Sequence, residues 1–191
     1  DVDGTLTFFD PDDMTDKDFS AVRPSRAVIE AFHRLRDAGH KAFICTGRPL
    51  WLIADSLRAL EPAGIVAMAG ATLEVEGRVV HEDCFDEDVI AELARRISVA
   101  GGEALFEANG ATYSLEPVGV EQSFLLGAGV VHSVEEMRVD GRLRVGKVCL
   151  NAPNLARVAN DDGFIERNFE LCNTGGENRE LSPKGIDKGV G

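Results

Sequence analysis

Hydrophobic and polar residues in the first seventy positions follow helical and strand-like spacings in turn. Residues 24–39 place apolar side chains three and four positions apart, as in an amphipathic helix with one face on a core. The short apolar runs 41–45 and 65–70 predict buried strands, and Pro49 opens a second predicted helix over residues 50–60. Strands that alternate with helices in this way predict parallel strands joined by right-handed crossovers, and therefore an α/β sheet.

The pattern changes after residue 70. Residues 71–83 alternate around Gly77, which predicts a hairpin, and an amphipathic helix with an acidic first turn follows. A second hairpin, a strand, a helix and a further strand are predicted in turn over residues 103–117, 147–153, 154–168 and 169–174. Residues 180–191 predict a linker followed by the start of a helix.

These elements predict one α/β core interrupted by a compact insert. We expect the core to comprise residues 1–83 and 182–191, and the inserted α+β unit to comprise residues 84–181. Residues 7–24 are polar and acidic without sustained periodicity, which predicts a long loop.

The charge and the cysteines of the chain limit which binding partners and which cellular compartment we expect. The chain holds 20 Lys and Arg against 33 Asp and Glu, a formal charge of −13, so its field repels nucleic acids and anionic membranes. No apolar run of about 18 residues is present, so we expect no membrane-spanning segment. The four cysteines fit no CxxC or zinc spacing, and no signal peptide precedes the first motif. We therefore expect a reduced, cytoplasmic protein.

The chain opens with two aspartates one residue apart, in the stretch DVDGT. Side chains alternate along a strand, so Asp1 and Asp3 are expected to point to the same face. Two carboxylates this close repel each other unless a cation lies between them or one keeps its proton. Gly4 allows a sharp turn directly after them. A solvated acidic turn is the alternative interpretation, but the motifs further along the chain favour a site.

The predicted sheet places other polar groups at the same edge. Thr46 and Gly47 directly follow the strand 41–45, and open α/β sheets bind ligands at the carboxyl ends of their strands. A lysine from the end of the chain, Lys184 or Lys188, could complete the site. A carboxylate can attack phosphorus, and a second carboxyl group can protonate the leaving oxygen and then activate water. Mg²⁺ prefers oxygen ligands and would screen the carboxylates and bind the phosphate.

Three motifs resemble those of the haloacid dehalogenase (HAD) superfamily, in particular its Cof-type hydrolases with an α/β cap. DVDGTL is similar to the first motif of that family, ICTGRP to the second and ELSPKGIDKG to the third. The insert lies between the second and third motifs, where these enzymes carry their cap, and the resemblance spans essentially the whole chain. It implies a Rossmann-like parallel sheet with a cap domain, and a Mg²⁺-dependent phosphomonoester hydrolase that forms an aspartyl-phosphate.

The resemblance also implies a role for each matching residue. Asp1 is expected to be the nucleophile and a metal ligand, and Asp3 the general acid and base, with its backbone carbonyl on the metal. Thr46, with Gly47 at the turn, is expected to bind phosphate. Lys188 is the expected third-motif lysine, because it follows PKG and precedes a glycine. Arg48 either helps to hold phosphate, as in Cof-type enzymes, or forms a salt bridge at the end of the strand.

The chain departs from the family pattern at three places. The strand that should precede Asp1 is absent, and the acidic Gly-Asp-x-x-Asn-Asp motif, which supplies a further metal ligand, is absent after Gly191. From these two departures we expect the sequence to be part of a longer chain. Ala69 stands where the family usually has asparagine, which weakens any contact made there.

We therefore expect a phosphatase that acts on small phosphorylated metabolites such as sugar phosphates. The alternatives are a phosphomutase on the same scaffold and a catalytically silent, phosphate-binding or regulatory HAD domain. A two-component receiver also uses a phosphorylated aspartate, but it is smaller and lacks the insert. Four bases of the insert are candidates for meeting an anionic or hydroxyl-rich substrate: Arg138, Arg142, Arg144 and Lys147.

Overall fold

The computed structural model describes residues 1–8, 19, 22–119, 127–139, 142–159, 162–186 and 189. Most of the loop expected over residues 7–24 lies outside this set. The chain divides into two compact units, Asp1–Glu82 with Asp187–Gly191 (unit 1) and Asp83–Ile186 (unit 2). Among the described residues, no helix combines the length and the apolar character needed to cross a bilayer.

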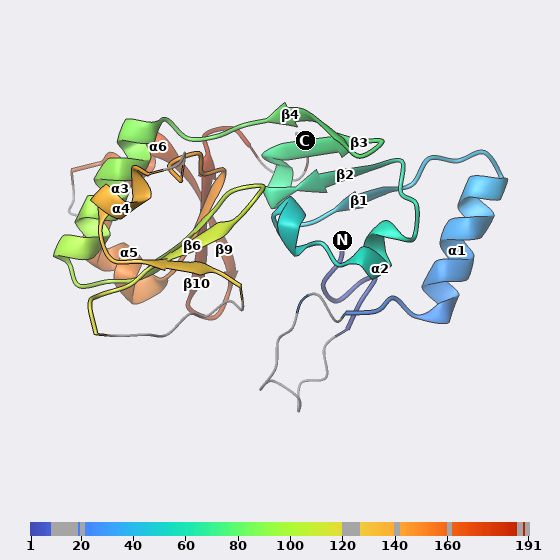
Figure 1. Ribbon diagram of the computed structural model, residues 1–191, viewed down its shortest axis with the longest axis horizontal. Helices are drawn as coiled ribbons and strands as arrows, with labels where there is room; N and C mark the ends of the chain where they lie inside the picture. Colours follow the sequence, from blue (N-terminus) through green and yellow to red (C-terminus); the bar gives the residue numbers. More distant parts are fainter. Residues whose placement is uncertain are drawn as a thin grey trace. The chain divides into compact units, whose positions relative to one another are not determined.

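Unit 1 is built on a four-stranded sheet in the order β1-β2-β3-β4 (Figure 1). β1 (Phe43–Cys45) and β2 (Gly64–Ala67) are parallel, whereas β3 (Thr72–Val75) and β4 (Arg78–Glu82) continue the sheet as an antiparallel hairpin. The parallel pair and the hairpin around Gly77 confirm the α/β prediction for this part of the chain. Val2, Ile44 and Ile65 lie in the core of the unit, each at most 2 % exposed.

Helix α1 (Arg26–Asp37) forms where the periodicity predicts it. Ser25 caps its first turn, because the side-chain oxygen accepts the Val28 N–H at 3.3 Å. Val28 and Phe32 of its apolar stripe pack against the core of unit 1. The Ala38 N–H donates to the carbonyl of Arg34 and so closes the last turn.

The continuous helix predicted over residues 50–60 is wrong. The segment instead forms a 3₁₀ turn, η1 (Leu50–Leu52), and a single α-helical turn, α2 (Asp55–Arg58), with extended backbone between them. Arginine side chains take up two carbonyls at this break: Leu52 accepts from Arg48 Nη1 at 3.5 Å, and Leu50 from Arg58 Nη2 at 3.2 Å. At Leu52 the arginine takes the place of the backbone N–H that a continuous helix would supply, whereas the Leu50 carbonyl also accepts the Ile53 N–H at 3.3 Å.

Unit 2 is a six-stranded sheet covered by helices. The strand order is β7-β6-β5-β8-β10-β9, and only the β6–β7 pair is parallel. The strands are β5 (Ala104–Glu107), β6 (Thr112–Leu115), β7 (Gly129–Val131), β8 (Lys147–Asn151), β9 (Phe169–Gly175) and β10 (Asn178–Pro183). The helices are α3 (Glu87–Val99), α4 (Val134–Met137), α5 (Ala152–Ala159) and α6 (Phe164–Asn168). In Figure 1, α3 and α5 lie on the same side of this sheet.

The core of unit 2 forms between these helices and alternate positions of the strands. Ile90, Leu93 and Ile97 of α3 share one fully buried cluster with Phe106 of β5 and Val148 of β8. Because strand side chains alternate between the two faces of a sheet, the intervening residues of β5 and β8 point away from this core. Those intervening positions include the polar groups described below.

Two other predictions in unit 2 need correction. The helix predicted over residues 154–168 is divided into α5 and α6, and Gly163, at a φ of 70°, starts the second of these with a left-handed backbone. Residues 180–183 belong to strand β10 rather than to a linker, and β10 pairs with both β8 and β9. The β9–β10 hairpin turns at Gly175 and Gly176, both with positive φ. This turn brings β10 back antiparallel to β9.

Candidate active site

The opening turn carries two exposed carboxylates on either side of one buried residue. Val2 is fully buried in the core of unit 1, whereas Asp1 and Asp3 on either side of it are exposed. This is the alternation expected of extended backbone, with the apolar side chain inward and both carboxylates outward. Burial of Val2 therefore fixes the place of the two acidic side chains.

The backbone after Asp3 folds tightly back on the Val2 carbonyl. That oxygen accepts the N–H groups of Thr5, Leu6 and Thr7 at 3.2, 2.9 and 3.1 Å. Gly4 has a φ of 74°, a left-handed conformation that glycine adopts without steric cost, and its N–H donates to the Thr7 carbonyl at 2.8 Å. The DVDGT turn is thus a preformed structure rather than a loose acidic loop.

The Arg48 guanidinium binds the Asp3 carboxylate through two nitrogen atoms. Arg48 Nε lies 3.0 Å from Asp3 Oδ2, and Nη2 contacts Oδ1. Such a two-point contact between a planar guanidinium and a carboxylate sets the orientation of both groups. Of the two roles expected for Arg48, the structure contains the salt bridge; its contact with phosphate stays a prediction.

Arg48 is itself held firmly. Its side chain is 5 % exposed, and Nη1 donates to the carbonyls of Phe19 and Leu52 at 3.3 and 3.5 Å. The guanidinium carbon also lies 4.6 Å from the centre of the Phe19 ring, within the range of a cation–π contact. Asp3, by contrast, keeps 43 % of its side-chain surface exposed. A rigid arginine therefore holds a carboxylate that solvent can still reach.

Thr46 and Gly47 lie at the carboxyl end of β1, as the motif predicts. Thr46 is fully buried, its N–H donates to the Val66 carbonyl at 2.8 Å, and its hydroxyl oxygen accepts the Arg48 N–H at 3.2 Å. Unit 1 therefore brings together Asp3, Arg48 and Thr46 in one hydrogen-bonded group. Binding of phosphate by Thr46 and Gly47 is not tested by these contacts and stays a prediction.

Of the two candidate lysines, the structure describes only Lys184. Lys188 lies outside the described residues. Lys184 belongs to unit 2, is about half exposed, and lies with Nζ 3.7 Å from Glu170 Oε2.

The donor groups of the opening turn suit a hard cation. Asp1 and Asp3 offer carboxylate oxygens from one exposed turn, which are the ligands that Mg²⁺ prefers. Within the ranges that the structure describes, no group of three or more His, Cys, Asp and Glu side chains could hold a metal ion. The donor groups of Asp1 and Asp3 thus fit a hard cation by their chemistry.

The four bases proposed for substrate contact in unit 2 have different surroundings. Arg138 and Arg144 are exposed, and Arg142 lies with its guanidinium carbon 5.2 Å from the centre of the Tyr113 ring. Lys147 is buried, at 3 % exposed, and its Nζ lies 3.0 Å from Glu107 Oε2 and 3.2 Å from Glu180 Oε1.

Sequence reasoning missed the two carboxylates that flank Lys147. Burial alone would lower the pKa of Lys147, but the charges of Glu107 and Glu180 outweigh it and raise that pKa above its ordinary value. Cys149 lies beside them, 3.5 Å from Glu107 Oε1, and burial raises the pKa of its thiol well above the ordinary value. The alternation of β5 and β8 could have indicated a shared face, but not the register that brings Glu107 opposite Lys147.

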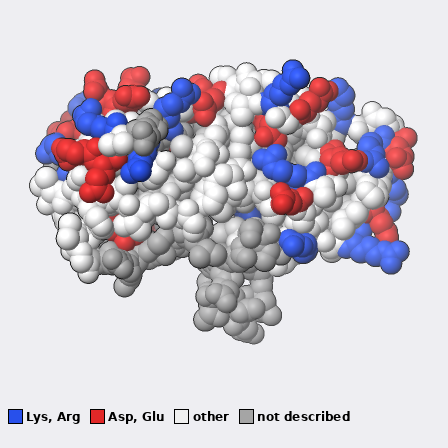
Figure 2. Space-filling model, viewed as in Figure 1, with Lys and Arg blue, Asp and Glu red and all other residues white. Residues whose placement is uncertain are grey.

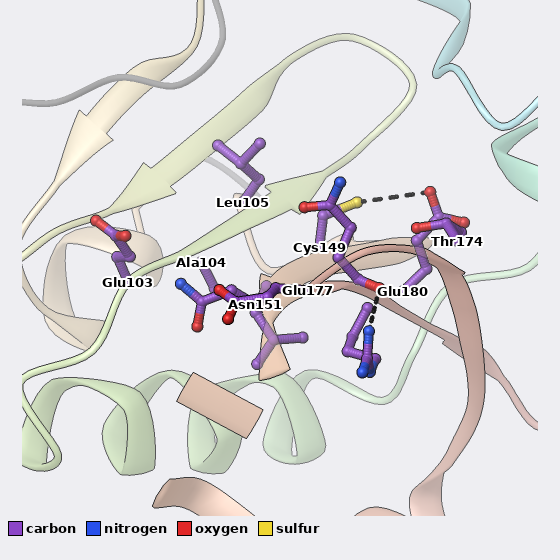
Figure 3. Close-up of a pocket in the computed structure, with 11 residues that line it drawn as sticks. Glu103, Ala104, Leu105, Cys149, Asn151, Thr174, Glu177 and Glu180 are labelled. Atoms are coloured by element: carbon purple, nitrogen blue, oxygen red, sulfur yellow. Dashed lines mark hydrogen bonds between the residues drawn. The ribbon is translucent and has the colours of Figure 1, made fainter. Parts of the chain in front are cut away.

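A hollow of about 470 Å³ opens beside this group (Figure 3). Cys149 and Glu180 line it, and Glu103, Asn151 and Asn178 add polar groups from the neighbouring ends of the strands. Burial raises the pKa of Glu103, and the charge of Glu116 raises it further. The lining is therefore rich in oxygen acceptors and carries more acidic than basic groups.

On the displayed face, the charged side chains of the described residues form no single patch. In Figure 2, Lys and Arg side chains lie beside Asp and Glu side chains over both units. Among the described residues, acidic and basic side chains are therefore interspersed on this face.

Solved structures with the same fold are similar to the chain at low sequence identity. They include BT4131, a HAD subclass IIB sugar phosphatase (21 % identity, TM-score 0.68, 91 % of this chain and 68 % of that one). BT1666 from Bacteroides thetaiotaomicron, a HAD-superfamily phosphatase, has 19 % identity and a TM-score of 0.68 over 89 % of this chain and 63 % of that one. A protein of Eubacterium rectale has 18 % identity and a TM-score of 0.72 over 98 % of this chain and 71 % of its own.

The chain spans about two thirds of the length of these proteins. No curated protein matches it. The family model of the haloacid dehalogenase-like hydrolases matches residues 1–191. Because this match covers the whole of this sequence, the chain belongs to the haloacid dehalogenase-like hydrolases.

Proposed function

We propose that the protein is a Mg²⁺-dependent phosphomonoester hydrolase that acts on small phosphorylated metabolites. The observation that carries this proposal is the Asp1–Asp3 turn, whose second carboxylate is oriented by Arg48 beside Thr46. The similarity to BT4131 and BT1666, both phosphatases, supports the same reaction class.

The two carboxylates divide the reaction between them. Asp1 attacks phosphorus, so that an oxygen–phosphorus bond forms to its carboxylate as the bond to the leaving oxygen breaks. Asp3 donates a proton to that oxygen, then takes a proton from water as the water attacks phosphorus. This second attack releases inorganic phosphate and regenerates both carboxyl groups. Arg48 keeps the Asp3 carboxylate in one orientation through both steps.

Asp1 and Asp3 would hold the cation. When bound, Mg²⁺ screens the negative charges of carboxylate and phosphate and so favours their approach. Thr46 and Lys188 would contribute a hydroxyl and an ammonium to the phosphoryl oxygens.

Unit 2 would act as the cap that selects the leaving group. The hollow in it is lined by Glu103 and Glu180 together with the amides of Asn151 and Asn178. Carboxylates repel an anionic leaving group, whereas carboxylates and amides together bind hydroxyl groups well. We therefore propose a hydroxyl-rich leaving group, as in a sugar phosphate.

The experiment is an assay of phosphate release from p-nitrophenyl phosphate and a panel of sugar phosphates, with Mg²⁺ and with EDTA. We expect turnover in Mg²⁺, its loss in EDTA, and inhibition by excess Ca²⁺, which is larger and takes more ligands. Asp3→Asn should abolish or severely slow turnover while phosphate affinity is kept. Full activity in EDTA would contradict the proposal, and so would transfer of phosphate within the sugar without release, which would indicate a mutase.

A further inference from the structure

Three consecutive residues after β2 have a left-handed backbone. Their φ angles are 47° at Met68, 55° at Ala69 and 112° at Gly70. In a residue with a side chain, positive φ brings Cβ close to the backbone, so only glycine adopts it easily. Two such residues in succession persist only where the surrounding structure holds them, and such strain is most often found at functional sites.

The surroundings that hold this turn are the loop after β1. The Met68 N–H donates to the carbonyl of Arg48, and the Ala69 N–H to that of Thr46, both at 3.0 Å. The regular pairing of β1 with β2 ends before these residues, at Cys45 opposite Val66. The two hydrogen bonds therefore attach the loop after β1 to the turn after β2, beyond the last regular strand pair.

We propose that the left-handed turn Met68–Gly70 positions Thr46 and Arg48, and through Arg48 also Asp3. Positive φ at Met68 and Ala69 reverses the chain at the end of β2, so that both N–H groups face the loop instead of running on beside it. Ala69 is thus a positioning residue, and this inference rests on the proposed phosphatase function for what the positioned groups do.

A second pair of left-handed residues in unit 1 serves as a control for the turn Met68–Gly70. Glu76, at a φ of 50°, and Gly77, at 73°, form a left-handed pair at the exposed tip of the β3–β4 hairpin. A substitution there introduces the same kind of backbone strain in the same unit.

The first test compares Ala69→Val with Glu76→Val, because a β-branched residue is poorly tolerated at positive φ. Both variants should melt at a lower temperature than the wild type. Only Ala69→Val should weaken binding of inorganic phosphate in calorimetry, by about tenfold or more, since a small displacement of positioned groups is costly. Only Ala69→Val should speed hydrogen exchange at the amides of residues 46–48, and Ala69→Gly should behave as the wild type.

A second pair covers the case in which Ala69→Val does not fold. Gly70→Ala and Gly77→Ala each add one methyl group at positive φ, and only Gly70→Ala should change phosphate affinity and the exchange of residues 46–48. The inference is overturned if a folded Ala69 or Gly70 variant matches its control in both measurements. If the wild type binds no phosphate, the proposed function fails, while the exchange comparison still decides whether the turn positions the loop.

Discussion

Arg48 Nε lies 3.0 Å from Asp3 Oδ2, and Nη2 of the same guanidinium contacts Oδ1. This pairing joins the residue that follows Thr46-Gly47 to the second aspartate of the opening turn, 45 positions away in the chain. The arginine is buried and the aspartate is partly exposed, so the contact orients a carboxylate that a substrate can still approach.

Replacing Arg48 tests whether this contact matters for turnover. Arg48→Met should lower kcat by about 10²-fold, because the Asp3 carboxylate loses its fixed orientation. Arg58→Met is the control, since Arg58 also binds a carboxylate, that of Glu74 at 2.7 Å, and a carbonyl in the same unit. Each variant should lose about 1–2 kcal/mol of unfolding free energy, because each ion pair is partly exposed. Equal kinetic effects of the two substitutions would show that Arg48 serves only the fold.

The two lysines near the end of the chain should differ in kinetic effect. Lys188→Ala should lower kcat by about 10²–10³-fold, the cost of losing a charge-assisted contact to a developing anion. Lys184→Ala should change kcat little, because Lys184 only forms a half-exposed pair with Glu170. Steady-state kinetics of both variants measure the difference. A larger effect at Lys184 would assign the third motif to the other lysine.

Arg96 of α3 makes the stability of unit 2 sensitive to acid. It binds Glu92 at 2.8 Å and Asp162 at 2.6 Å. Hydrogen bonds from Arg95 and Arg96 lower the pKa of Glu92 from 4.5 to about 2, and those from Arg96 and the Phe164 N–H lower the pKa of Asp162 from 3.8 to about 2.

Both carboxylates bind their partners in the charged form. They therefore stabilise the fold above their ordinary pKa values, and this stability is lost as pH falls towards about 2. The wild type should lose more of its melting temperature over this range than Arg96→Gln. Arg95→Gln should fall between them, because Arg95 binds Glu92 alone of the two acids. If the melting temperatures of wild type and Arg96→Gln fell by the same amount as the pH is lowered, this would contradict the role assigned to Arg96.

Exchange of unit 2 tests its role in selectivity. Replacing residues 83–186 with the corresponding unit of a relative should change the preference among sugar phosphates, because a cap that closes over a site decides which leaving group fits. Hydrolysis of p-nitrophenyl phosphate should persist. An unchanged preference would place selectivity in unit 1.

Local signals in the sequence predicted the elements that depend on local causes. The stripe of α1 and the Gly77 turn are examples, because spacing and glycine act within a few residues. The motifs also predicted Asp3 and Thr46 at one edge of the sheet; the hydrogen bonds that link them through Arg48 come from the structure.

Features that depend on distant partners could not be predicted in this way. The break between η1 and α2 involves arginine side chains that take up its carbonyls, and the helical spacing of residues 50–60 carries no sign of them. Strand β10 was missed because its stability comes from two partner strands rather than from its own six residues. The pairing of Lys147 with Glu107 depends on the register between β5 and β8.

The rate of p-nitrophenyl phosphate hydrolysis by Asp1→Asn, in Mg²⁺ and beside wild type, tests the central claim most directly. Asp37→Asn is the control, because Asp37 is an exposed aspartate at the end of α1 in the same unit. If Asp1 is the nucleophile, Asp1→Asn should lose about 10³-fold or more of kcat while Asp37→Asn keeps the wild-type value. A folded Asp1→Asn protein with a rate within about tenfold of wild type would contradict the account.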